Sequence, residues 1–161
     1  MKTFPTRLDE PFEKTIDEVV QEKLKLLALQ DGDVLVDLGC GDARNLIAAT
    51  KLADIQCIGY EILPKALEAA TKNIEDAGLA DRIEIIEKDF LRADLSNANA
   101  LILYLTRNSL GKLSGKLENE LPKGTRIVTH DFDIPGWTAE KVIDFQSKEA
   151  FLFTFYVYCV Q

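Results

Sequence analysis

Apolar and polar residues follow two kinds of spacing along this chain. Between residues 14 and 29, apolar side chains recur every three or four positions with charged residues between them, which predicts an amphipathic helix. The next apolar stretch, residues 34–36, is short and continuous and breaks into a glycine-bearing loop. That pattern is typical of a buried strand rather than a helix.

The same two patterns then alternate. Helices are predicted at residues 43–52, 64–77 and 109–121, and strands at residues 56–60, 83–86, 100–103 and 125–129. Strands that alternate with helices at this spacing indicate a parallel sheet with helices on both faces.

The end of the chain departs from this alternation. Residues 142–146 and 151–160 read as two consecutive strands joined by a short polar turn, which predicts an antiparallel hairpin. We interpret the alternating aromatic residues of the last strand as the two faces of a packed sheet. The sequence therefore predicts an α/β fold whose seven-stranded, mostly parallel sheet ends in a C-terminal antiparallel hairpin.

Length and composition limit the choices further. The 161 residues, 47% hydrophobic and 29% charged, suit one globular domain spanning residues 1–161, with residues 1–30 forming the lip of a pocket. No apolar run is long enough to cross a bilayer, and residues 1–7 lack the apolar core of a secretory signal. We therefore expect no membrane span and a cytoplasmic location.

Charge and cysteine content narrow the possible partners. Cys40, Cys57 and Cys159 are odd in number and far apart, and His130 is the single histidine, so we predict neither a disulfide framework nor a metal site. The formal net charge of -8 would repel phosphate backbones, so it argues against a nucleic-acid partner and favours a cationic one. The same charge is also explained by solubility alone.

The first glycine-bearing loop carries the clearest chemistry. It reads Asp37-Leu38-Gly39-Cys40-Gly41-Asp42 and sits where the first strand of the sheet meets the following helix, a position where ligands bind in open α/β sheets. A dinucleotide loop would need a third glycine where Arg44 stands, and a pyrophosphate would be repelled by the two aspartates. The loop suits a ligand that carries an ammonium and a sulfonium. We interpret Cys40 as a small packing residue.

Two later strands end in further carboxylates. Glu61 lies about 20 residues past the glycines, the usual distance for an acidic side chain that receives ribose hydroxyls. Asp89 follows the third strand and offers a carboxylate for an adenine amino group, with Phe90 as an apolar wall beside it. Tyr104 and Thr106 place polar groups at the end of the apolar fourth strand.

From residue 34 to residue 106 the chain resembles the class I S-adenosylmethionine-dependent methyltransferases, in the order and spacing of its motifs. Such enzymes have a Rossmann-like fold with a terminal antiparallel hairpin. A narrower resemblance covers nearly the whole chain. It is to the small archaeal protein lysine methyltransferases, a group similar to the mitochondrial enzymes that methylate lysines of ATP synthase subunit c and of adenine nucleotide translocase. The segments that carry it are residues 11–20, 37–44, 59–61, 103–106, 116–121 and 124–137.

The resemblance implies S-adenosyl-L-methionine as cofactor, S-adenosyl-L-homocysteine as product and protein lysines as acceptors. It implies three groups of site residues: Asp37, Gly39, Cys40, Gly41, Glu61, Ile62, Asp89, Phe90 and Thr15 at the cofactor; Tyr104, Thr106 and His130 as catalytic residues; and Phe12 and Trp137 at the substrate. This chain departs from the family at two places. Its first segment reads Pro11-Phe12-Glu13-Lys14-Thr15 where the family usually has a Pro-Ser/Thr-Pro type segment, and Ala43 stands where glycine is frequent.

Methyl transfer from a sulfonium is an in-line displacement, so the protein mainly aligns donor and acceptor. A lysine acceptor must also lose a proton, because its reference pKa is near 10.4. Other readings stay open at this stage: a methyltransferase for a small molecule or for RNA, and a non-catalytic subunit that only binds the cofactor. An enzyme that uses a nicotinamide cofactor is a more distant possibility.

Overall fold

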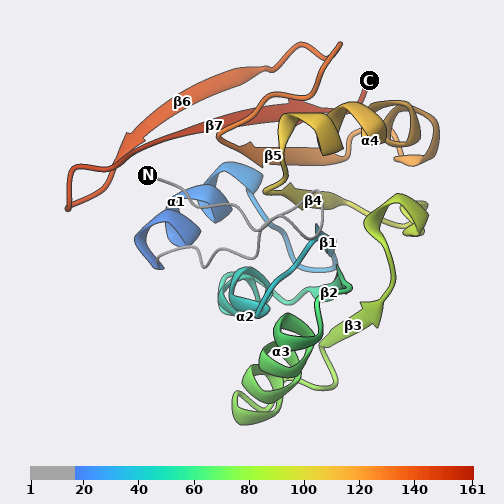
Figure 1. The fold of residues 1–161 in the computed structure, drawn as a ribbon, viewed down its shortest axis with the longest axis vertical. Coiled ribbons are helices and arrows are strands. Elements are labelled where there is room, and N and C mark those ends of the chain that lie inside the picture. The colour runs from blue at the N-terminus through green and yellow to red at the C-terminus, as the bar shows by residue number, and fades with distance from the viewer. Residues whose placement is uncertain (1–16) are drawn as a thin grey trace.

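A computed structural model describes residues 17–161 of the chain, and its elements follow the predicted alternation (Figure 1). The helices are α1 (Asp17–Leu27), α2 (Arg44–Ala49), α3 (Pro64–Asp76) and α4 (Arg107–Glu120), with a short 3-10 helix η1 (Phe90–Arg92). The strands are β1 (Val34–Leu38), β2 (Gln56–Glu61), β3 (Ile83–Glu87), β4 (Ala100–Leu103), β5 (Arg126–His130), β6 (Lys141–Gln146) and β7 (Leu152–Cys159).

All seven strands form one sheet in the order β3-β2-β1-β4-β5-β7-β6. The first five pair in parallel, whereas β7 pairs antiparallel with both β5 and β6. The chain order reverses between β1 and β4, which is the switch point where α/β sheets bind ligands. The predicted seven-stranded, mostly parallel sheet with a C-terminal hairpin is confirmed.

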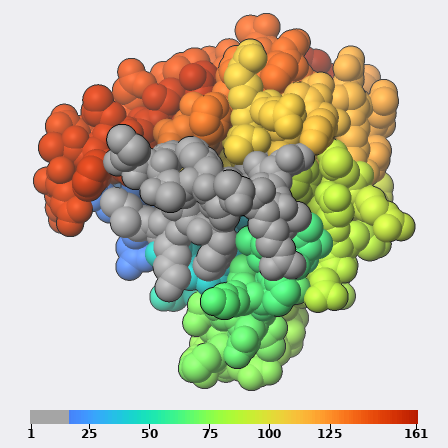
Figure 2. Space-filling model, viewed as in Figure 1, coloured from blue at the N-terminus to red at the C-terminus, as the bar shows by residue number. Residues whose placement is uncertain are grey.

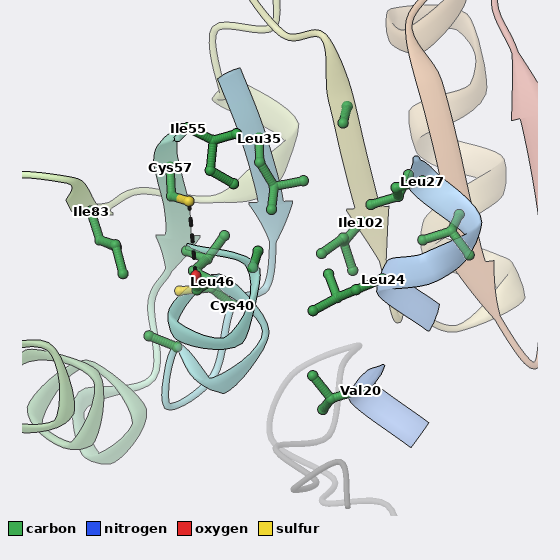
Figure 3. Packing of buried hydrophobic residues seen from close by; sticks show 14 of the residues in the cluster. Val20, Leu24, Leu27, Leu35, Cys40, Leu46, Ile55, Cys57, Ile83 and Ile102 are labelled. Carbon is green, nitrogen blue, oxygen red and sulfur yellow. Dashed lines mark hydrogen bonds between the residues drawn. The ribbon is translucent and has the colours of Figure 1, made fainter. Parts of the chain in front are cut away.

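Helices cover both faces of the sheet, and each face has its own core. On one face α1, α2 and α3 bury Leu24, Leu46 and Ile74 against the sheet. Figure 3 shows this core, with Leu24 and Leu27 of α1 beside Ile102 of β4. On the other face α4 buries a row of leucines at helical spacing: Leu110, Leu113 and Leu117.

The last strand contributes to both cores, as the alternation of its aromatic residues predicted. Phe155 belongs to the core under α1, and Tyr158 to the core under α4. The β6–β7 hairpin and α3 lie at opposite ends of the molecule (Figure 2). Together these contacts fix the sheet edge against α1 on one face and α4 on the other.

Arg126 of β5 fastens the C-terminal end of α1 to the sheet. Its guanidinium donates to the carbonyl oxygens of Leu27 at 2.9 Å and Ala28 at 2.6 Å, and pairs with Asp33 at 2.5 Å. These bonds satisfy carbonyls that the helix end leaves without intrahelical partners. They also fix the inner face of α1 over the sheet.

Over residues 17–161 we find no helix with the length and apolarity needed to span a membrane. Within the same range, no group of three histidine, cysteine or acidic side chains is arranged to hold a metal ion.

Candidate functional site

The carboxyl ends of the parallel strands bring the predicted residues to one edge of the sheet. Leu38, the last residue of β1, pairs with Tyr60 of β2 on one side and with Leu103 of β4 on the other. Leu103 in turn pairs with Thr129 of β5. The residues that follow each of these, among them Glu61 and His130, therefore lie in a row along one edge.

The glycine loop after β1 folds tightly onto the end of β2. Gly39 and Gly41 have φ values of 77° and 58°, in the left-handed region that glycine adopts at little cost. The N–H groups of Gly39 and Cys40 both donate to the carbonyl oxygen of Tyr60, at 2.8 and 3.0 Å. Ala43 is also left-handed, with φ 69°, at the position where the resembling family often has glycine.

Glu61 is held by the backbone around it. One carboxylate oxygen accepts from the N–H of Gly41 at 2.9 Å, and the other from the N–H groups of Ile62 and Leu63 at 2.9 and 3.1 Å. A carboxylate has about four acceptor positions, so one more remains for a ligand hydroxyl. Glu61 is thus a fixed acceptor that also joins the glycine loop to the end of β2.

Asp37 is the most deeply buried acid of the site, with 2% of its surface exposed. Burial raises the pKa of Asp37 from its ordinary 3.8 to about 6, against the opposing effects of the Lys23 ammonium and of a 3.2 Å hydrogen bond from the Asn45 amide. A cationic ligand would stabilise the ionised carboxylate. We call Asp37 and Glu61 the carboxylate side of the edge.

The second aspartate of the loop has a different task. Asp42 makes a two-pronged contact with the Arg44 guanidinium, whose Nη2 lies 2.9 Å from its carboxylate. Arg44 therefore stands where a dinucleotide loop has its third glycine and is engaged by an acid. This arrangement is unsuited to a pyrophosphate, as the sequence predicted.

Cys40 packs against the strand beneath the loop. It is 5% exposed and belongs to the core under α1, which confirms its interpretation as a packing residue. A Cβ added to Gly59 of β2 would lie 2.6 Å from the Cys40 sulfur, so only glycine fits there. Burial, together with nearby Asp37 and Glu61, raises the pKa of the Cys40 thiol far above its ordinary value, which keeps the thiol protonated.

The residues after β3 and β2 complete this half of the edge. Asp89 caps the η1 turn, because its carboxylate accepts from the N–H of Leu91 at 2.9 Å. Phe90 is half-buried beside the core under α4, and Ile62 is exposed. Their contacts with a cofactor stay predictions.

Aromatic rings line the other half of the edge, beyond β4 and β5. The rings of Tyr104 and His130 stack with centroids 3.9 Å apart, and His130 is 1% exposed. The ring centroids of Phe153 and Phe155, both on β7, lie 5.4 and 5.2 Å from the centroid of the His130 ring. We call these four residues the aromatic side. The structure thus brings together Tyr104 and His130, two of the three residues predicted to be catalytic.

Thr106 and Trp137 have structural contacts of their own. Thr106 caps α4 by accepting from the N–H of Ser109 at 3.2 Å. Trp137 packs edge-on against Tyr158, at 6.0 Å, in the core under α4, on the opposite face of the sheet from the ring of Phe155. The structure therefore does not bring Trp137 to the aromatic side. Phe12 and Thr15 lie outside the described residues.

Two polar residues at this edge were missed from the sequence. Asn45 of α2 donates to Asp37, and Lys23 of α1 lies with its ammonium 5.6 Å from the centroid of the Tyr104 ring, fully buried. Lys23 could have been found, because it falls on the inner stripe of α1 between Val19 and Leu27, where an apolar residue is expected. Asn45 carries no comparable signal.

The residues of the edge fit S-adenosylmethionine. The ligand presents hydroxyls, an ammonium and a sulfonium, and the carboxylate side offers Glu61 as a fixed acceptor and Asp37 as a buried acid that a cation would stabilise. The left-handed glycines let the loop backbone approach a ligand closely.

Comparisons with known proteins agree with this fit. The family model described as the ANTKMT methyltransferase domain matches residues 37–141. A protein-lysine N-methyltransferase of Saccharolobus islandicus (strain REY15A) is 37% identical over 83% of this chain and 83% of its own length. The adenine nucleotide translocase lysine N-methyltransferase of Mus musculus is 31% identical over 86% of this chain, which spans 60% of that protein.

A solved structure is also similar over nearly the full length. The crystal structure of an RNA methyltransferase from Salinibacter ruber in complex with S-adenosyl-L-homocysteine superposes with a TM-score of 0.85 at 35% identity, covering 92% of this chain and 94% of that one. The match of the family model and the archaeal relative over most of the chain establish the family. This chain belongs to the ANTKMT methyltransferase domain family and is an S-adenosylmethionine-dependent methyltransferase.

Proposed function

We propose that this methyltransferase transfers methyl groups to lysine side chains of proteins. The observation that carries the proposal is the division of one sheet edge into a carboxylate side and an aromatic side, with Asp37 and Tyr104 at their boundary. The archaeal and mouse relatives, both named as lysine methyltransferases, support the same acceptor.

The carboxylate side binds the cofactor in this proposal. Glu61, already held by three backbone N–H groups, accepts a hydrogen bond from a ribose hydroxyl. Asp89 and Phe90 receive the adenine after β3, and Asp37 receives the ammonium of the amino-acid part. S-adenosylmethionine supplies a methyl group activated by its sulfonium. Each charge-assisted hydrogen bond contributes about 1.5–3 kcal/mol.

The aromatic side receives the acceptor. A lysine ammonium enclosed by the rings of Tyr104, His130 and Phe153 loses part of its hydration, and burial favours the neutral amine that can attack. The Tyr104 hydroxyl orients the amine. Because the reaction is an in-line displacement, holding the two partners in line is the main task of the edge.

Charge supports a basic acceptor protein. The net charge of -8 steers cationic surfaces toward the enzyme and slows the approach of polyanions. Steering of this kind weakens as ionic strength rises, because exposed charges are screened beyond about 8–10 Å at physiological salt.

RNA is the second candidate acceptor, favoured by the similarity to the Salinibacter ruber structure, which is described as an RNA methyltransferase. The acidic charge of this chain opposes it, since phosphate binding depends on cationic side chains. Within residues 17–161, no observation specifically favours a small-molecule acceptor or a non-catalytic role.

The test is transfer of a tritiated methyl group from S-adenosylmethionine to a panel of basic proteins, to tRNA and to a small-molecule extract. We expect label on protein, released as methyl-lysine after hydrolysis. Glu61→Ala should abolish the label, whereas Glu68→Ala, an exposed glutamate of α3, should leave it unchanged.

Two other outcomes would contradict the proposal in different ways. Label on tRNA with none on protein would replace lysine by RNA as the acceptor and keep the cofactor site. Tight cofactor binding with no label on any acceptor would indicate a non-catalytic subunit.

A further inference from the structure

Lys23 occupies a position where an apolar side chain is expected. It lies on the inner face of α1, four residues from both Val19 and Leu27, and its side chain is completely buried. Lysine is almost never fully buried unless its charge is paired. A leucine at this position would continue the apolar stripe of α1, so packing alone does not explain why a lysine is found there.

The surroundings of Lys23 place its ammonium at the boundary of the two sides of the edge. It lies 5.6 Å from the centroid of the Tyr104 ring, which follows β4. It also acts electrostatically on Asp37 of β1, where burial raises the pKa of the carboxyl and the Lys23 charge opposes that rise. Because β1 and β4 are neighbouring strands, both contacts fall on one short stretch of the edge.

Stability alone does not explain such an arrangement. Removing two charges from water costs about as much as their mutual attraction returns, so apolar side chains of similar size are often as good or better. A lysine and an aspartate at the same buried place are, however, the complement of a ligand that carries both a carboxylate and an ammonium. The amino-acid part of S-adenosylmethionine is such a zwitterion.

The direction of the bound cofactor follows from the proposed function. If the adenosine lies at Glu61 and Asp89, at the ends of β2 and β3, the rest of the molecule extends across β1 toward β4. We propose that Lys23 binds the carboxylate of the cofactor's methionine part while Asp37 receives its ammonium, an inference that rests on the proposed placement of the adenosine at Glu61. Lys23 is then a cofactor-binding residue contributed by α1.

The experiment compares two ligands that differ by one group. S-adenosylhomocysteine has the carboxylate, and S-adenosyl-3-thiopropylamine, its decarboxylated analogue, keeps the ammonium and lacks the carboxylate. Their dissociation constants are measured calorimetrically at pH 8, where Asp37 is ionised, for the wild-type chain, Lys23→Met and the control Lys25→Met. Lys25 lies on the same helix with 72% of its side chain exposed.

We expect wild type and Lys25→Met to bind S-adenosylhomocysteine at least about tenfold more tightly than the analogue, as a charge-assisted hydrogen bond requires. Lys23→Met should lose this preference, so that the two ligands bind within about threefold of each other. Lys23→Gln, which keeps a polar tip, provides a second variant, and the thermal unfolding of each variant shows that it is folded.

The inference is overturned if Lys23→Met weakens both ligands by the same factor, because that result describes a merely structural lysine. It is also overturned if the preference for the carboxylate persists. In either case wild-type binding and methyl transfer would leave the proposed function standing. A wild-type chain that binds neither ligand would refute the proposed function and this inference together.

Discussion

The two sides of the sheet edge are held by different kinds of contact. On the carboxylate side, Glu61 accepts hydrogen bonds from three backbone N–H groups, all of residues within 20 positions of it in the chain. On the aromatic side, Tyr104 and His130 are positioned by ring contacts with each other and with β7. Directional bonds fix the first side, whereas packing between distant elements fixes the second.

This difference predicts how each side responds to change. A hydrogen-bonded carboxylate cannot be removed without leaving buried donors unsatisfied, at about 1–3 kcal/mol each. Stacked rings contribute about 0.5–1.5 kcal/mol beyond their buried area and tolerate the loss of one polar atom. Removal of the Glu61 carboxylate should therefore impair both folding and cofactor binding, and removal of one polar atom from the aromatic side should impair transfer alone.

The largest effect is expected at Glu61. Glu61→Ala removes the acceptor of three N–H groups and the proposed partner of the ribose, so the affinity for S-adenosylhomocysteine should fall by more than about 100-fold and the free energy of unfolding by about 3 kcal/mol or more. Calorimetry and urea denaturation measure the two quantities. Glu68→Ala should change neither, and a Glu61→Ala chain of wild-type stability would contradict the role of Glu61 in joining the loop to β2.

The carboxylate side was readable from the sequence because its contacts are local. The glycine loop and Glu61 are joined across two adjacent parallel strands, and the distance of about 20 residues between them reflects one strand–helix–strand unit. The sequence did not indicate that the Glu61 carboxylate also holds the glycine loop in place. Every residue except proline has a backbone N–H, so the sequence does not show which of these groups donate to Glu61.

Asp37 predicts a pH dependence with a definite sign. Its pKa, raised by burial to about 6, means that between about pH 4 and pH 6 the folded chain keeps a proton that the unfolded chain has released. Stability should therefore fall as pH rises through this window, by about 3 kcal/mol in total for a shift of about two units. Asp37→Asn, which resembles the protonated carboxyl, should be the more stable chain at pH 7.5 and equal to wild type near pH 4.

Cofactor binding should show the opposite trend, because an ammonium is bound by the ionised carboxylate. The affinity of wild type for S-adenosylhomocysteine should rise from pH 5 to pH 7, and Asp37→Asn should show a flat and weaker profile. Urea denaturation and calorimetry at five pH values give both curves. Parallel curves for the two chains would show that Asp37 does not titrate in this range.

The packing beneath the carboxylate side gives a third prediction. Gly59→Ala would place a Cβ 2.6 Å from the Cys40 sulfur and 2.9 Å from Cδ1 of Ile85, an overpacking that costs about 1–3 kcal/mol. At about 3 °C per kcal/mol for a domain of this size, Tm should fall by about 3–9 °C. Gly115→Ala, on α4 with open space around its Cβ, should instead raise Tm slightly, because alanine favours helix. Equal melting of Gly59→Ala and wild type would show that the loop can move away from β2.

The aromatic side was only partly predictable. Tyr104 and His130 were expected near the acceptor because both lie at the ends of strands of the parallel sheet. The contact of His130 with Phe153 of β7 was not expected, because Phe153 lies more than 20 residues further along the chain. Lys23 was missed because the inner face of an amphipathic helix is identified from its apolar residues. Asn45 was missed because the sequence predicts the helix that carries it but not the hydrogen bond from its amide to Asp37. Trp137 was predicted at the substrate because it lies in a sequence segment that resembles the family. In the structure its ring packs in the core under α4.

The smallest expected effect separates the two sides most cleanly. Tyr104→Phe removes one hydroxyl and keeps the ring that stacks on His130. The equilibrium constant of unfolding and the dissociation constant of S-adenosylhomocysteine should therefore both stay within about twofold of wild type. If the hydroxyl orients the acceptor amine, kcat for methyl transfer should fall about tenfold, the value of one hydrogen bond made in the transition state. Tyr156→Phe makes the same deletion on the other face of the sheet, in the core under α4, and should leave kcat unchanged. If Tyr104→Phe lowers cofactor affinity as well as kcat, the two sides of the edge act as one unit. If it lowers kcat alone, the acceptor binds at Tyr104 and the cofactor binds at the carboxylates.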